Sequence, residues 1–226
     1  RFTFLVVNRS RKELADVNFS VGLTYLLDRN ALVASALNSF ADPVWYPLNP
    51  SWAATRQANL NPDIFSPPAA GDAFVQAGLV LKDTQRVYGG KPVTLRILVN
   101  RENASRVKAA EFVAESLRMA GFGAEVVQAT WDEYQVALET LDYDLYLGEV
   151  NLPANLDLSV LFTPEVCNTG ELPGTYDLLR AEAKAVLNGE TEVRTFVSNF
   201  QNSLPFIPLY YAQDALAVSM EVSGQF

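Results

Sequence analysis

The middle of the chain alternates between two hydrophobic periods. Runs of β-branched and apolar residues, typical of buried strands, are followed by stretches in which apolar residues recur at helical spacing. Thr130 is positioned as the N-cap of one helix, and Gly121 ends the other. The pattern predicts strands at 93–99, 124–128 and 143–148 and helices at 107–120 and 131–141. Ligands of such open α/β sheets lie at the carboxyl ends of the strands, which here means residues 149–157.

The preceding residues predict one further strand and three helices. The strand covers 2–7, and the helices cover 17–28, 31–37 and 71–78. Asp16 and Asn30 are the expected N-caps of the first two helices. Residues 39–68 are rich in proline and aromatic side chains, and predict an ordered but irregular segment rather than sheet or long helix. The pair Gly89-Gly90 predicts a turn.

The last third of the chain predicts two amphipathic helices and a closing strand pair. The helices are expected at 176–187 and 192–204, and the strands at 206–211 and 215–219. Tyr210 and Tyr211 alternate within a strand, so one is expected to face the core and the other the outside. Asp157 is the expected N-cap of a short apolar segment at 158–162. Because the first and last strands lie outside the central unit, the fold class is α/β with a mixed β-sheet and flanking helices, in a single domain over 1–226.

Composition predicts a globular chain with a buried core. Its 226 residues are 49% hydrophobic, which is ample for a buried core. The longest apolar runs fall well short of the roughly 20 residues that span a bilayer, so we expect no transmembrane helix. No signal peptide is visible, and residue 1 is Arg, followed directly by a strand. The chain is therefore expected to be a fragment of a larger protein, in which targeting signals lie elsewhere.

Charge and missing residue types argue against several functions. A formal net charge of −9 argues against a nucleic-acid partner, because binding phosphates needs a cationic face. A single cysteine, Cys167, excludes an internal disulfide and multi-cysteine metal sites. With no histidine, hydrolases with an imidazole base and most catalytic transition-metal sites are disfavoured. We expect no cofactor and no metal, whereas glycoside hydrolysis by two carboxylates remains open.

Three local signatures occur in order along the chain. The first runs from Asp16-Val17 to the segment Leu26-Leu27-Asp28-Arg29-Asn30-Ala31-Leu32, the second is Tyr143-Asp144-Leu145-Tyr146-Leu147-Gly148, and the third is Leu204-Pro205-Phe206-Ile207-Pro208-Leu209-Tyr210-Tyr211, followed by Val222-Ser223-Gly224. They resemble, respectively, the helix pair "DVRVRQAISYAIDREAL", the strand "YDLYLGGW" and the strand "PVIPLYY" of the peptide/nickel class (family 5) of extracytoplasmic solute-binding proteins that serve ABC importers. The resemblance covers nearly the whole chain.

The resemblance implies both a fold and a function. The family has a two-lobe periplasmic-binding-protein-like (type II) fold that closes on a ligand, and this chain resembles the second, C-terminal lobe alone. The implied function is non-enzymatic: capture of an oligopeptide-like solute and its delivery to a membrane ABC permease. The implied partners are that solute, the permease and the missing first lobe. The implied location is extracytoplasmic, in the periplasm or at the cell surface, with lipid anchoring through a segment absent from this sequence.

The ligand loop departs from the family pattern. Where peptide binders have a "GW-x-x-D-Y-x-D-P" run, Glu149 holds the tryptophan position and Leu152 the position of the aspartate that pairs with a peptide's amino terminus. Glu149 can replace that partner from a shifted place, and Asn151 or Asn155 can hydrogen-bond a peptide backbone or a sugar hydroxyl. An ordinary solvated turn after the strand is the alternative for this loop.

Two aromatic residues complete the candidate site. Trp45 and Tyr46 lie where the first cleft loop of the family is expected, and rigid aromatic side chains give a large contact area at small entropic cost. The other interpretation is that they fix an irregular loop onto the core. The candidate ligand-binding residues are therefore Glu149, Asn151, Leu152, Asn155, Trp45 and Tyr46.

Two other functions stay open at this stage. The same two-lobe fold can serve as the solute-sensing domain of a transcription regulator, which an upstream helix-turn-helix would indicate. A carboxylate-dependent glycosidase is the third reading, and it requires two acids within roughly 5–10 Å of each other in a cleft.

Overall fold

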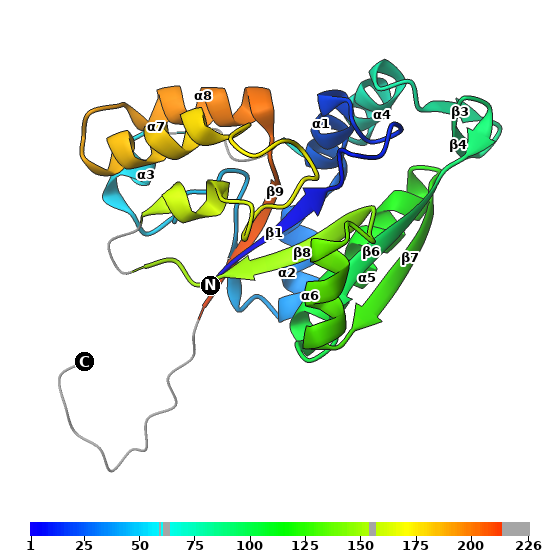
Figure 1. The fold of residues 1–226 in the computed structure, drawn as a ribbon, viewed down its shortest axis with the longest axis horizontal. Coiled ribbons are helices and arrows are strands. Elements are labelled where there is room, and N and C mark those ends of the chain that lie inside the picture. The colour runs from blue at the N-terminus through cyan, green and yellow to red at the C-terminus, as the bar shows by residue number, and fades with distance from the viewer. Residues whose placement is uncertain (59, 61–63, 154–156, 214–226) are drawn as a thin grey trace, which may run out of the picture.

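The chain forms a mixed six-stranded sheet with helices on both faces and a separate three-stranded sheet at one end (Figure 1). The computed structural model describes residues 1–58, 60, 64–153 and 157–213. The large sheet consists of β1 (Phe2–Val7), β2 (Ala41–Pro43), β6 (Thr94–Asn100), β7 (Gly123–Ala129), β8 (Leu145–Val150) and β9 (Ile207–Ala212), in the order β2-β9-β1-β8-β6-β7. β6 pairs parallel with β7 and β8, while β1 pairs antiparallel with β8 and β9.

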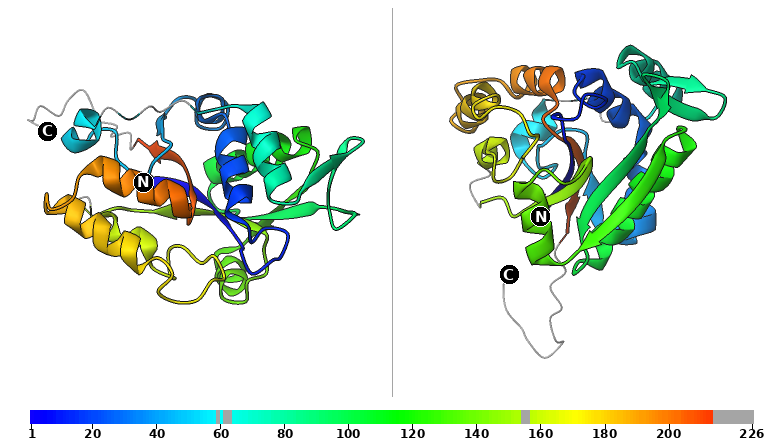
Figure 2. Two further views of the ribbon diagram at one scale, coloured as in Figure 1. Left: turned by 90° about the horizontal axis from the view of Figure 1, so that it is seen from above. Right: turned by 45° about the vertical axis from the view of Figure 1, so that its right-hand side comes forward.

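Helices cover the two faces of the sheet (Figure 2). A separate hydrophobic cluster lies between the sheet and the helices on each face. The first face packs against α1 (Val17–Leu26), α2 (Arg29–Leu37), α4 (Pro67–Gln76) and α5 (Ala104–Met119); the second packs against α6 (Trp131–Glu139), η1 (Leu158–Phe162), α7 (Asp177–Leu187) and α8 (Val193–Ser203). Alternation along β8 shows this division, since Leu145 and Leu147 join the first cluster and Tyr146 joins the second. Burial on both faces explains why β1 and β9 are mostly apolar.

The central β-α-β-α-β unit and three of the expected caps are confirmed. β6, α5, β7, α6 and β8 follow one another in the predicted order. The Thr130 side chain and Glu133 form a reciprocal capping box at the start of α6. The side chain of Asp16 accepts a hydrogen bond from the Asn18 amide, and that of Asp157 accepts one from the Ser159 amide.

Two predicted helix starts are wrong. α2 begins at Arg29 and not at residue 31, because the Asp28 side chain caps it by accepting from the Ala31 amide at 3.0 Å; Asn30 lies inside the helix. α4 begins at Pro67, four residues before the predicted start, with Ser66 as its N-cap. Proline suits the first helical position, where the missing N–H would have no partner, so here it marks a start and not an interruption.

The proline-rich segment is less irregular than expected. It contains the short helix α3 (Ala53–Gln57) and the strand β2, which pairs with β9, so the exclusion of sheet is wrong for residues 41–43. Pairing to β9 at the edge of the sheet tolerates the proline at the end of β2. The predicted strand 215–219 and the Val222-Ser223-Gly224 motif lie outside the described residues.

Two further features differ from or extend the prediction. Tyr210 and Tyr211 are both buried, at 1% and 7% exposure, because helices cover both faces; neither faces the outside. The small sheet of β3 (Val80–Lys82), β4 (Gln85–Tyr88) and β5 (Lys91–Pro92) was not predicted. The turn at Gly89 and Gly90 between β4 and β5 is confirmed, with φ of +56° and +81°.

Across the described ranges, no helix is both long and apolar enough to cross a membrane.

Candidate functional site

A polar cavity of about 290 Å³ lies at the edge of the large sheet where β8 ends. Its lining includes Glu149 from β8, Tyr210 from β9, and Asn103, Ser105 and Lys108 from the amino-terminal end of α5. We call this cavity the edge pocket. It lies at the carboxyl ends of the parallel strands β6 and β8, the expected place for a ligand in an open α/β sheet.

Glu149 belongs to a row of three polar side chains across the sheet. Strand register places Glu149 of β8 opposite Thr3 of β1, and Thr3 opposite Tyr210 of β9. The Thr3 hydroxyl donates to Glu149 Oε2 at 3.5 Å, and the Arg1 guanidinium lies 3.6 Å from Glu149 Oε1. Both contacts are long, so the carboxylate can still accept strong hydrogen bonds from a ligand. The side chain of Glu149 is only 14% exposed.

Tyr210 stays protonated at neutral pH. Its pKa is raised to about 12, mainly by burial; the hydrogen bond with Thr3 acts to lower the pKa, and the negative charge of Glu149 contributes to the rise. The edge pocket thus combines a phenolic hydroxyl with a partly buried carboxylate.

The amino-terminal end of α5 supplies the positive side of the edge pocket. The Asn103 side chain caps the helix by accepting from the Arg106 amide at 3.1 Å. Lys108 lines the pocket one turn into the helix, and the helix dipole adds partial positive charge at the same end. The edge pocket therefore presents charges of both signs, as a zwitterionic ligand requires.

The remaining loop candidates lie elsewhere or outside the described residues. Asn151 is exposed just after β8, and Leu152 packs against the hydrophobic cluster on the α7 and α8 face. Asn155 lies outside the described residues. Within the described part of residues 149–157, Glu149 is thus the candidate that lines the edge pocket.

Trp45 and Tyr46 line a different cavity of about 330 Å³, together with Leu48 and Thr55. Trp45 is 8% exposed and lies under the guanidinium of Arg29, whose Cζ is 5.9 Å from the ring centroid. Burial raises the pKa of the half-buried Tyr46. The structure does not bring these two aromatic side chains into the edge pocket.

Sequence reasoning missed most of the edge pocket. Thr3, Tyr210, Asn103 and Lys108 were not candidates, although Asn103 shows the N-cap pattern of a helix that begins just after a strand. The strand register that joins Thr3 and Tyr210 to Glu149 connects residues far apart in sequence and leaves no local signal.

The described residues also bear on metal binding and on glycoside hydrolysis. In the part of the chain that the structure describes, no group of three or more His, Cys, Asp or Glu side chains could hold a metal ion. Among the described residues that line the edge pocket, Glu149 is the one carboxylate, whereas glycoside hydrolysis requires a facing pair.

Comparison with known proteins identifies a family and a fold. Residues 1–164 match the family described as "Bacterial extracellular solute-binding proteins, family 5 Middle". No curated protein sequence matches the chain. Solved structures match over 93% of the chain, at sequence identities that support likeness of fold alone.

Three of these structures were solved with chemically different ligands. NikA from Brucella suis in complex with Fe(III)-EDTA has a TM-score of 0.75 at 16% identity. The oligopeptide-binding protein AppA from Bacillus subtilis in complex with a nonapeptide has a TM-score of 0.74 at 18% identity. A mannohexaose-bound periplasmic oligopeptide-binding protein from Thermotoga maritima has a TM-score of 0.75 at 19% identity. The chain spans 45%, 44% and 44% of their lengths, less than half in each case, and their ligands differ too much for the fold to identify one.

Proposed function

Because the chain belongs to family 5 of the bacterial extracellular solute-binding proteins, we propose that it is one lobe of a two-lobe ABC-importer receptor and contacts the solute through the edge pocket. The observation that carries this proposal is the partly buried carboxylate of Glu149 at the carboxyl end of β8, with both oxygens only loosely held. A second lobe, closing over this edge, would complete the site and exclude water. Coverage of less than half of the matched structures supports the missing-lobe part of the proposal.

The proposed ligand is an oligopeptide or a similar zwitterionic solute. Glu149 would accept hydrogen bonds from an ammonium group, while Lys108 and the amino-terminal end of α5 would face a carboxylate or peptide carbonyls. The Tyr210 hydroxyl would add a neutral donor. Two matched structures, those from Bacillus subtilis and Thermotoga maritima, are of oligopeptide-binding proteins, which supports this class. The mannohexaose complex and the Fe(III)-EDTA complex make other ligand classes the alternatives to test.

The proposal includes a place and a partner for the receptor. A permease in the membrane would accept the solute from the closed receptor, on the outer side of the membrane. Two matched proteins, from Thermotoga maritima and Borrelia burgdorferi, are periplasmic oligopeptide-binding proteins, which supports this location. Lipid anchoring is an expectation from the sequence.

Calorimetric titration of the longest natural chain that contains this sequence tests the proposal. Pools of di- to penta-peptides are the probes, and pools of oligosaccharides and of metal chelates are the controls. Micromolar or tighter binding is expected for the peptide pool, corresponding to a free energy of about −8 kcal/mol or better. If the peptide pool gave no heat of binding and another pool did, the proposed ligand class would be overturned. If no pool gave a heat of binding, the receptor function would be overturned.

A further inference from the structure

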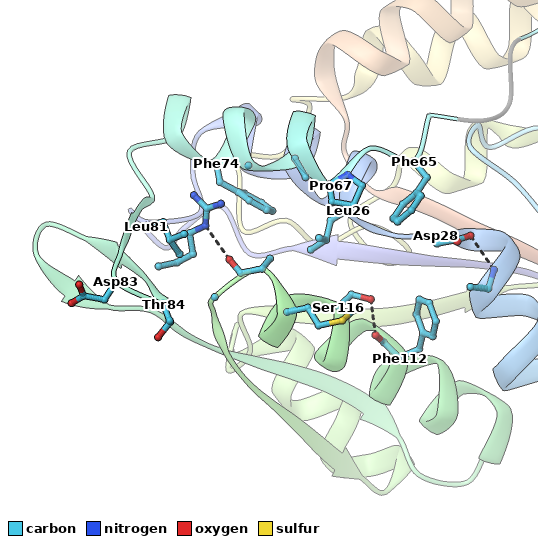
Figure 3. A pocket seen from close by; sticks show the side chains of 17 residues that line it. Leu26, Asp28, Phe65, Pro67, Phe74, Leu81, Asp83, Thr84, Phe112 and Ser116 are labelled. Atoms are coloured by element: carbon cyan, nitrogen blue, oxygen red, sulfur yellow. Dashed lines mark hydrogen bonds between the residues drawn. The ribbon is translucent and has the colours of Figure 1, made fainter.

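A third and larger cavity lies at the other end of α5 from the edge pocket. It has a volume of about 740 Å³ and runs between α4, the carboxyl-terminal half of α5 and the β3–β4 hairpin (Figure 3). We call it the α4–α5 groove. With 16 residues, α5 is roughly 24 Å long, so a ligand in the groove would not occupy the edge pocket.

The lining of the α4–α5 groove is mostly apolar. Buried Phe74 lies at its base, and Figure 3 shows Leu26 and Phe112 among the side chains around the same cavity. At its rim, Leu81 is 52% exposed and Met119 is 76% exposed. The volume falls in the range of about 300–1,000 Å³ that is typical of small-molecule sites, and the apolar surface favours an aliphatic ligand.

One cation, Arg86, lies in this apolar lining. Its residue is 7% exposed, its guanidinium carbon lies 5.4 Å from the centroid of the Phe74 ring, and it pairs with no carboxylate of the described residues. Nε donates to Ala120 O at 3.1 Å and Nη1 donates to Leu79 O at 3.0 Å, which fixes the side chain between the hairpin and α5. Burial lowers the pKa of Arg86, yet an arginine remains protonated at neutral pH.

The third nitrogen of Arg86, Nη2, has no hydrogen-bond partner among the described residues. It faces Gly71 of α4, where a Cβ atom would lie 3.4 Å from Nη2 and would meet no other heavy atom within 4 Å. The absence of a side chain at this position leaves room beside a charged donor. An anion placed there would gain a charge-assisted hydrogen bond from a guanidinium whose residue is mostly buried.

Two acids also line the groove but do not neutralise Arg86. Asp28 is engaged as the N-cap of α2, where its Oδ1 accepts from the Ala31 amide at 3.0 Å. Asp83 is exposed in the turn between β3 and β4, with φ of +56°. Neither forms an ion pair with Arg86, so the charge of the guanidinium remains available.

We propose that the α4–α5 groove binds an amphipathic monocarboxylate of the fatty-acid class, with its carboxylate on Arg86 Nη2 beside Gly71 and its alkyl chain along Phe74, Phe112 and Met119. An apolar groove alone would take any hydrocarbon. A single fixed cation without an acidic partner selects an anionic head group. This site is separate from the solute site proposed above.

Calorimetric titration with three twelve-carbon probes tests the head-group preference. The probes are dodecanoate and dodecyltrimethylammonium, each below its micelle concentration, and dodecanol below its solubility limit, against the 226-residue chain. We expect dodecanoate to bind at least about tenfold more tightly than the other two, as one charge-assisted hydrogen bond allows. Equal binding of all three probes would show nonspecific partition, and binding of none would show that the groove takes no twelve-carbon amphiphile; either result overturns the proposal.

A pair of variants on α4 tests the location. Gly71→Leu fills the space beside Nη2 without removing Arg86, and helix propensity favours the change. It is expected to weaken dodecanoate binding at least about tenfold. Gln76→Leu adds the same side chain at an exposed position of α4 outside the groove lining, and is expected to leave the affinity unchanged. Thermal unfolding checks that both variants are folded, and undiminished binding by folded Gly71→Leu would contradict the proposed site.

Discussion

Glu149 and Tyr210 lie on either side of Thr3, in one row across β8, β1 and β9. Thr3 is fully buried between them, and its hydroxyl reaches the Glu149 carboxylate at 3.5 Å. The row connects residues that are up to 207 positions apart, and it ends at the edge pocket, whose lining contains both Glu149 and Tyr210. The geometry of the candidate site therefore depends on the pairing of β1 between β8 and β9.

The guanidinium of Arg29 joins the carboxyl-terminal end of α1 to β9. Arg29 is fully buried, and its guanidinium donates to Pro208 O at 2.8 Å and to Thr24 O and Leu27 O at 3.0 Å. Arg29→Met would leave these three main-chain carbonyl oxygens without their donors. We expect the free energy of unfolding to fall by at least about 3 kcal/mol, measured by urea denaturation.

The matched control for Arg29 is the same substitution at an exposed arginine. Arg194 lies on the exposed side of α8, and Arg194→Met is expected to change the free energy of unfolding by no more than about 0.5 kcal/mol. If the two variants lost the same free energy of unfolding, the three hydrogen bonds of Arg29 would not contribute measurably to stability.

Two glycines are expected to respond to alanine in opposite directions. A Cβ atom at Gly148 would lie 2.5 Å and 2.6 Å from ring atoms of Phe4, so Gly148→Ala must displace a buried ring and should destabilise the fold by about 1–3 kcal/mol. Gly71→Ala lies in a helix with space around it, and should stabilise the fold by about 0.5–1 kcal/mol. Thermal and urea unfolding measure both changes. A stable Gly148→Ala variant would show that β8 and β1 do not pack as described.

The capping box at Thr130 and Glu133 predicts a loss of stability in acid. The backbone amide of Thr130 donates to the Glu133 carboxylate, and this bond, followed by that of the Thr130 hydroxyl, lowers the pKa of Glu133 below its ordinary value of 4.5. A carboxyl group with a lowered pKa in the folded state stabilises the fold above its unfolded pKa, and this stabilisation disappears as the pH falls through the folded value.

Glu133→Gln is therefore expected to be less stable than the unsubstituted chain at pH 7, and the difference should shrink as the pH falls below 4.5. Urea denaturation across pH 3–7 measures the difference. Glu139→Gln, in the last turn of the same helix, leaves the capping box intact and should retain the acid-side loss. A difference between Glu133→Gln and the unsubstituted chain that does not depend on pH would contradict the role of the charge.

Local sequence signals predicted the elements, and long-range pairing decided the site. The period change across residues 93–148 and the Thr130 cap depend on neighbours in sequence, so they were predictable. Asn30 was mistaken for a cap because Asp28, two residues earlier, competes for the same helix start. The prolines at the start of α4 resemble those of an irregular segment, although the first helical position accepts proline.

The candidate site was predictable only in part, for physical reasons. Glu149 follows directly from the rule that ligands lie at the carboxyl ends of parallel strands. Trp45 and Tyr46 were placed by likeness to a family loop, yet the structure puts them in another cavity, where Trp45 lies beside the buried Arg29. The edge pocket also needs the antiparallel neighbours of β8, and no periodicity within a strand reveals which strands pair.

Charge neutralisation at Glu149 tests the central claim most directly. Once a ligand is found among the pools described above, the longest natural chain that contains this sequence is titrated calorimetrically as the unsubstituted protein, as Glu149→Gln and as Glu125→Gln, a control on the exposed surface of β7. We expect Glu149→Gln to weaken binding by about 2 kcal/mol or more, roughly 30-fold, and Glu125→Gln to leave it unchanged. Equal affinity of all three proteins would show that the edge pocket does not hold the ligand.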